Sequence, residues 1–210
     1  MNLLVNDPAR LEQQLFDKIA DTAFPCVGAK SAMAREMLKV IPCHSLVSAW
    51  DDVRIHRELL DWAARYRKDP SGLRSLAVVF EGPENLDEAA FEAAMWERIQ
   101  SFADKDHWLG QSYDRRVSAD PDDPHFSLSF GGEAFFVVGL HPSASRPARR
   151  LPHPTLVFNL HDQFERLREE GRYERCAKRF SSGTASSPAR STRCWPAMAT
   201  PAKRASTAAA

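Results

Sequence analysis

Apolar and polar residues alternate along the chain with two periods, which predict helices and strands in succession. In residues 8–20, Leu11, Leu15 and Ile19 recur every four positions, which places them on one face of a helix. Asp7 precedes this run as a helix N-cap, and the proline that follows it suits the first helical position. The same helical spacing predicts further helices over residues 29–39, 50–67 and 85–102.

Two apolar runs, FSLSF and AFFVVGL, flank Gly131 and Gly132 and predict an antiparallel hairpin over residues 125–140. Glycine tolerates the positive φ that a two-residue hairpin turn requires. The second run is apolar at successive positions, Phe135 and Phe136 among them, so both of its faces should be covered by protein. We therefore expect this strand to lie at the centre of a sheet.

Two more strands are predicted over residues 75–80 (SLAVVF) and 155–158 (TLVF). Asn159 then caps a helix that carries Phe164 and Leu167 and ends near Gly171. Together these elements predict an α+β fold. It is a single domain in which helices pack on a mixed, mostly antiparallel sheet of about four strands.

The pattern changes after residue 175. Residues 176–210 carry six basic and no acidic side chains, and 23 of these 35 residues are Ala, Ser, Thr or Pro. Such a segment has too little bulky apolar surface to offset its chain entropy, so we expect a folded domain over residues 1–175 and a disordered tail over 176–210. Read one nucleotide out of frame, the tail permits a string with helical spacing and turn residues. We therefore hypothesise a frameshift near Arg175.

Charge and cysteine content limit the classes of function. The 28 basic and 28 acidic side chains of the whole chain balance, but residues 1–175 carry six more acidic than basic groups, which weighs against a nucleic-acid partner. No apolar run is long enough to cross a membrane, and the N-terminus lacks the apolar region of a signal peptide. The four cysteines form no CxxC pair, which favours a reducing cytoplasm over disulfides or a zinc ribbon.

The first candidate site is the loop over residues 139–150, which follows the predicted central strand. Arg146, Arg149 and Arg150 can form forked bonds to an anion, and His141 can ligate a metal or haem iron through a neutral ring nitrogen. The alternative is a solvated basic loop that pairs with the acidic groups of the domain.

The second candidate is the turn over residues 24–32 (FPCVGAKSA), which enters a helix. Backbone N–H groups at a helix start can hold an anion, and Lys30 adds positive charge. Cys26 there can act as a thiolate ligand or reactive thiol, although a lone cysteine is more commonly a small buried residue. The spacing is not that of a nucleotide-binding P-loop.

The remaining histidines and acids favour structural roles. Metal ligation by Cys43, His44, His153 and His161 is disfavoured because their spacing is not that of a zinc site. His125 precedes a strand and is interpreted as structural, and the acidic stretch over residues 120–124 (DPDDP) as a solvated turn.

Four separated motifs, in the same order, resemble the YqcI/YcgG family over about residues 12–175. They are FPCVGAKSA (24–32), DPDDPHFSLSFGGEAFFVVGLHP (120–142), SRPARR (145–150) and PTLVFNLHDQFERLREEGRYER (154–175). The out-of-frame reading of the tail contains the string SEARQYSG, which is similar to the C-terminal region of that family. The family's terminal tryptophan and Cys-Pro-Phe segment would then be missing from this chain.

The resemblance implies a haem-dependent N-hydroxylase that acts on the guanidino group of an arginine-like amino acid, as in guanitoxin biosynthesis, and that needs an electron donor. On that basis we expect His141 to be the axial iron ligand, with Cys26 as the alternative, and the three loop arginines to pair with the haem propionates. Candidates for binding the cationic guanidinium are Asp120, Asp122, Asp123 and Glu133. The alternative is a non-catalytic protein that binds a small molecule or anion through the basic loop.

Overall fold

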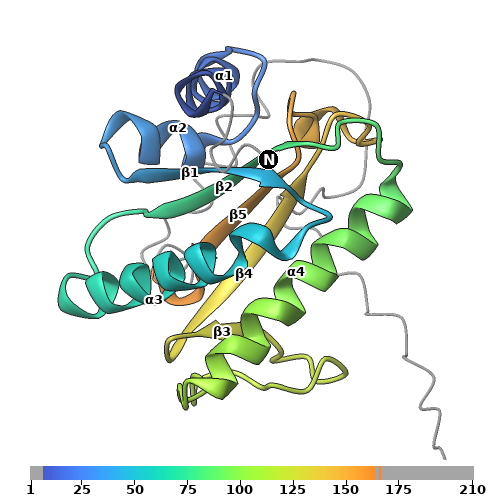
Figure 1. The fold of residues 1–210 in the computed structure, drawn as a ribbon. Coiled ribbons are helices and arrows are strands. Elements are labelled where there is room, and N and C mark those ends of the chain that lie inside the picture. The colour runs from blue at the N-terminus through green and yellow to red at the C-terminus, as the bar shows by residue number, and fades with distance from the viewer. Residues whose placement is uncertain (1–6, 164–165, 167–210) are drawn as a thin grey trace, which may run out of the picture.

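The computed structural model describes residues 7–163 and 166 (Figure 1). Its elements in chain order are α1 (Pro8–Ala20), α2 (Val27–Ala34), β1 (Leu38–Ser45), the 3-10 turn η1 (Ala49–Asp51), α3 (Asp52–Lys68), β2 (Ser75–Gly82), α4 (Glu88–Trp108), β3 (Leu128–Phe130), β4 (Glu133–Leu140), the 3-10 turn η2 (Pro147–Arg149) and β5 (Thr155–Leu160). None of the described helices has the length and apolar character that a membrane crossing requires.

Helix α1 forms as its sequence pattern predicts. The Asp7 side chain accepts a hydrogen bond from the backbone N–H of Arg10 at 2.9 Å, which satisfies one of the free amides at the helix start. Leu11, Leu15 and Ile19 are buried on one face of the helix. Both the N-cap and the apolar face are thus confirmed.

The five strands form one mixed sheet in the order β1-β2-β5-β4-β3. Strands β1 and β2 are parallel, and the other neighbours are antiparallel, so the α+β fold with a mostly antiparallel sheet is confirmed. The expectation of four strands is wrong because β1 was missed. The central position expected for β4 is also wrong: β5 lies at the centre, and β4 lies between β5 and the three-residue β3.

Helices cover both faces of this sheet (Figure 1). The apolar sequence of strand β2 is explained by burial of both of its faces. Its residues Leu76, Val78 and Phe80 join the core beneath α3 and α4, whereas the alternate residues Ala77 and Val79 join the core beneath α1. Side chains of a strand alternate between faces, so a strand covered on both sides needs apolar residues at every position.

The hairpin between β3 and β4 turns at two glycines, as predicted. Gly131 and Gly132 have φ values of 57° and 79°, a region that residues with a Cβ rarely adopt. A Cβ on Gly131 would also lie 3.0 Å from Cδ2 of Leu60, so the turn packs closely on α3.

The C-terminal predictions are only partly covered by the described residues. Residues 161–163 continue from β5 as helical backbone, in agreement with a helix after the last strand. The prediction that Asn159 is its N-cap is wrong: Asn159 lies within β5, and its side chain accepts a hydrogen bond from the Ser75 hydroxyl at 2.6 Å. The rest of that helix, including Phe164 and Leu167, and the tail over residues 176–210 lie outside the described residues.

Candidate functional site

The basic loop that follows β4 is folded back on itself by its own hydrogen bonds. The His141 amide donates to the carbonyl of Arg149 at 3.1 Å, and the Ala144 amide donates to the carbonyl of His141 at 3.3 Å. The Arg150 guanidinium donates to the carbonyls of Ala144 and Ser145, at 2.6 and 3.3 Å. Arg150 therefore shapes the loop, and its guanidinium is partly committed to backbone oxygens.

The His141 ring is buried beneath this loop. It is 4% exposed and stacks on the ring of Phe91 in α4, with centroids 4.3 Å apart. Its Nδ1 atom is buried and has no hydrogen-bond partner among the described residues. Burial lowers the pKa of His141, Arg149 lowers it further, and the Glu88 carboxylate opposes both. The ring is therefore neutral at pH 7 and holds a nitrogen that no group within residues 7–163 and 166 satisfies.

A glycine on β4 permits the close packing that positions Phe91. A Cβ on Gly139 would lie 2.7 Å from the Phe91 ring and 2.9 Å from the sulfur of Met95. Only a residue without a side chain lets α4 approach the end of β4 so closely. This contact places the aromatic ring against His141, two residues farther along the chain.

Arg146 and Arg149 form the cationic part of the loop. Burial lowers the pKa of Arg149, and the nearby Arg146 charge lowers it further, although a guanidinium stays charged at neutral pH. The neighbouring carboxylate of Glu88 accepts hydrogen bonds from the Ser145 amide and hydroxyl, at 2.9 and 2.8 Å. Within residues 7–163 and 166, neither arginine forms an ion pair with a carboxylate. Arg146 and Arg149 are therefore the two loop cations with no carboxylate bound to them in the described part of the chain.

Cys26 and Lys30 lie at the start of α2, away from these contacts. Cys26 is exposed and is the N-cap, with its sulfur accepting from the Ala29 amide at 3.4 Å. The Lys30 ammonium donates to the carbonyl of Thr22 at 3.5 Å. In the part of the chain that the structure describes, no hydrogen bond or ion pair joins either side chain to the basic loop.

The three other histidines considered as metal ligands have protein partners in the structure. His44 Nδ1 lies 3.0 Å from Asp51, His153 Nε2 lies 2.8 Å from Gln14, and the His161 ring stacks on Phe136. Among the described residues, no three His, Cys, Asp or Glu side chains come together as a metal site.

The acidic candidates for a guanidinium partner divide into two groups. Asp120 accepts from the Asp122 amide at 3.0 Å and Asp123 accepts from the His125 amide at 2.8 Å, which makes the 120–124 stretch an exposed hydrogen-bonded turn. Glu133 is buried, but its carboxylate is bound by Arg116 at 2.7 Å and lies 3.7 Å from Arg67.

Sequence reasoning missed the ion-pair network around Arg116. Its guanidinium contacts Asp114 at 2.6 Å, Glu133 at 2.7 Å and Asp162 at 3.5 Å. Burial alone would raise the pKa of Asp114, but hydrogen bonds from Arg116 and from the Ala134 amide hold it below its usual value. These residues come from three separate segments, residues 114–116, 133–134 and 162, so no spacing in the sequence predicts the network.

This network makes a specific contribution to stability at neutral pH. Replacing Arg116 by Gln is expected to lower the free energy of unfolding by about 1.5–3 kcal/mol at pH 7, because hydrogen bonds to a buried carboxylate are lost. The pKa of Asp114 is lower in the folded than in the unfolded chain. Its contribution is therefore fully present above about pH 4 and is lost as the pH falls through the lower folded value.

Urea unfolding at a series of pH values from 7 to about 2 tests this prediction. The difference in the free energy of unfolding between wild type and Arg116→Gln should become smaller in acid. Arg115→Gln is the matched control, since Arg115 is exposed and forms no ion pair among residues 7–163 and 166. A difference that stays constant with pH would show that Asp114 is not the group that Arg116 stabilises.

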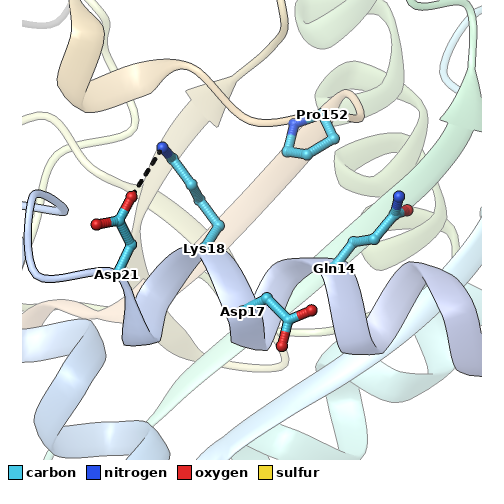
Figure 2. A pocket seen from close by; sticks show the side chains of 5 residues that line it. All are labelled: Gln14, Asp17, Lys18, Asp21 and Pro152. Carbon is cyan, nitrogen blue, oxygen red and sulfur yellow. Dashed lines mark ion pairs between the residues drawn. The ribbon is translucent and has the colours of Figure 1, made fainter.

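A shallow cavity of about 310 Å³ lies beside α1 (Figure 2). It is lined by Gln14, Asp17, Lys18, Asp21 and Pro152. The Lys18 ammonium lies 3.6 Å from the Asp21 carboxylate across this surface. None of the site residues predicted from the sequence lines this cavity.

Comparison with known proteins gives one match. No curated protein and no solved structure matches the chain. The family model described as the YqcI/YcgG family matches residues 15–185, which is more than half of the chain and includes the second half of α1, the whole sheet and the basic loop. The chain therefore belongs to the YqcI/YcgG family.

Proposed function

We propose that this protein is a haem-dependent N-oxygenase that hydroxylates the guanidino group of an arginine-like amino acid, with electrons from a separate donor. The observation that carries the proposal is the buried Nδ1 of His141, which has no hydrogen-bond partner in the described part of the chain and belongs to a ring whose pKa is lowered. A neutral imidazole nitrogen is the form that binds iron. The free thiols of Cys26 and Cys43 support a cytoplasmic location.

The residues of the loop fit the chemistry of a haem site. His141 would ligate the iron, and Arg146 and Arg149, which lack carboxylate partners among the described residues, would pair with the propionates. Bound haem would supply activation of oxygen. Because protein atoms cover Nδ1, ligation would require these atoms to move away from the His141 ring. Cys26 is the alternative ligand, since its thiol is exposed.

Haem titration of the full chain, followed by visible absorption, tests the proposal. Wild type is expected to give a Soret band, and His141→Ala is expected to lose haem retention because no ligand remains. Cys26→Ala should keep the wild-type Soret position, since ligand identity sets the spectrum. His125→Ala is the matched control, because the His125 side chain is 85% exposed in a surface turn.

The opposite pair of results, with haem lost in Cys26→Ala and kept in His141→Ala, would assign the ligand to Cys26. No Soret band in the folded wild-type protein would end the haem proposal for this chain. Circular dichroism of each variant separates a lost ligand from a lost fold.

A second candidate function is binding of a small anion without catalysis. The observation that favours it is the Arg146 and Arg149 pair without a carboxylate partner among the described residues. Calorimetric titration with a dicarboxylate would then show binding that weakens in Arg149→Gln, in a protein that takes up no haem. Equal binding by wild type and Arg149→Gln would remove this candidate.

A further inference from the structure

The outer edge of β1 is the starting point, because β1 is an eight-residue strand at the end of the sheet. The Ser75 amide of β2 donates to the carbonyl of Met37 at 3.1 Å, so odd-numbered residues of β1 turn their backbone groups toward β2. The even-numbered residues, Val40, Pro42 and His44 among them, therefore turn theirs to the outer edge. Such an edge can pair with a strand of another chain.

Three features close the middle of this edge. Pro42 has no N–H to offer, and its carbonyl accepts a hydrogen bond from the Arg54 guanidinium at 2.6 Å. The His44 amide donates to the Asp51 carboxylate at 2.8 Å. Arg54 and Asp51 are themselves paired at 2.9 Å, so one ion pair occupies two outward backbone groups of neighbouring even positions.

The Asp51–Arg54 ion pair is anchored by Asp51, whose side chain is buried. Asp51 is 5% exposed and also lies 3.0 Å from Nδ1 of His44. Arg54 is about half exposed and reaches over the strand from α3. The Arg54 side chain, which covers the Pro42 carbonyl, is therefore accessible to solvent, whereas the Asp51 carboxylate that holds it is buried.

Three exposed apolar side chains follow β1 in the chain. Val47, Trp50 and Val53 are 53%, 51% and 61% exposed, and they lie in the segment that carries Asp51 and Arg54. Two copies of β1 related by a two-fold axis would pair antiparallel, and in one register the outward amide of Val40 in each copy faces the outward carbonyl of Pro42 in the other. A second copy of this chain is thus the occupant whose donor and acceptor match those of this edge.

We propose that the Asp51–Arg54 ion pair closes the β1 edge against pairing with β1 of a second copy, and that opening the pair produces an edge-to-edge dimer. This inference does not depend on the proposed function, because it uses no residue of the basic loop. Binding of an unrelated extended peptide at the edge is a different outcome that the test separates.

Sedimentation equilibrium of Arg54→Ala tests the proposal, with Arg57→Ala as the matched control. Arg57 is also exposed on α3 but forms no ion pair within the described ranges. Self-association of Arg54→Ala is expected to tighten about tenfold relative to wild type and Arg57→Ala, roughly the effect of one or two net hydrogen bonds. Asp51→Asn is a second variant, since it weakens the pair but keeps an acceptor for the His44 amide.

Hydrogen exchange locates the contact. In the dimer the outward amide of Val40 is expected to gain protection, because it pairs with the second copy. Folded Arg54→Ala and Asp51→Asn proteins with unchanged self-association would overturn the proposal. Tighter association without protection of Val40 would also overturn it, because the contact would then use another surface.

Discussion

Replacing Phe158 by alanine is expected to lower the free energy of unfolding by about 3–5 kcal/mol. Phe158 has no exposed surface and lies in β5, the central strand. Its ring lies 6.2, 6.0 and 6.5 Å from the rings of Phe102, Phe130 and Phe135. The variant removes the ring that all three other rings contact. Because β5 is held between β2 and β4, the surrounding residues cannot easily move in to fill the resulting cavity.

Urea unfolding of Phe158→Ala measures this loss, which is a large fraction of the 5–15 kcal/mol typical of a whole domain. Phe158→Leu, which keeps most of the volume, is expected to cost about 1.5 kcal/mol or less. Phe16→Ala is a second control, since Phe16 is only half-buried and belongs to neither core cluster. Equal losses in Phe16→Ala and Phe158→Ala would contradict the central role of this ring.

The strands that helices cover on both sides could be predicted, because burial of both faces requires a continuous run of apolar residues. Strand β2 and the hairpin at Gly131 and Gly132 were recognised in this way. The order of the strands could not be predicted. Apolar residues on both faces of β4 report that helices cover it, but they do not report which strands lie beside it.

Strand β1 was missed because its sequence, LKVIPCHS, contains a proline and three polar residues. Pro42 is tolerated since its missing N–H falls on the outer edge, which no sequence pattern reveals. The preceding helix was predicted over residues 29–39 but ends at Ala34. Glu36 reverses the chain there with a φ of 57°, and a helix that ends without glycine gives little signal.

The candidate site was predicted in part. The loop with His141 and its arginines follows β4 as expected, but the stacking of Phe91 on His141 joins residues 50 positions apart and has no local signal. The sequence also did not show that Arg150 would bind loop carbonyls, whereas Arg146 and Arg149 would lack carboxylate partners among the described residues. The contacts of these loop residues depend on how the loop after β4 packs against α4, and residue spacing in the sequence does not show that packing.

Removal of the Asp106 carboxylate is expected to cost as much as removal of the Phe158 ring. Asp106 in α4 is 6% exposed and lies 2.9 Å from Nε2 of His56 in α3. Both of its oxygens also lie 3.1 Å from the amide of Gly131 in the hairpin turn. One carboxylate therefore joins two helices and the β3–β4 turn in a place that water does not reach.

Asp106→Ala should lower the free energy of unfolding by about 3–5 kcal/mol, because it leaves a buried imidazole and a buried amide without partners. Asp104→Ala is the matched control and should stay within about 0.5 kcal/mol, since Asp104 is exposed and, among the described residues, its side chain is hydrogen-bonded only by Gln100. Asp106→Asn should lose less than Asp106→Ala, because an amide oxygen can still accept from Gly131. Faster exchange of the Gly131 amide in Asp106→Ala would locate the loss at the turn. Equal stability of the Asp106 and Asp104 variants would mean instead that Gly131 and its close packing on Leu60 hold the turn without the carboxylate.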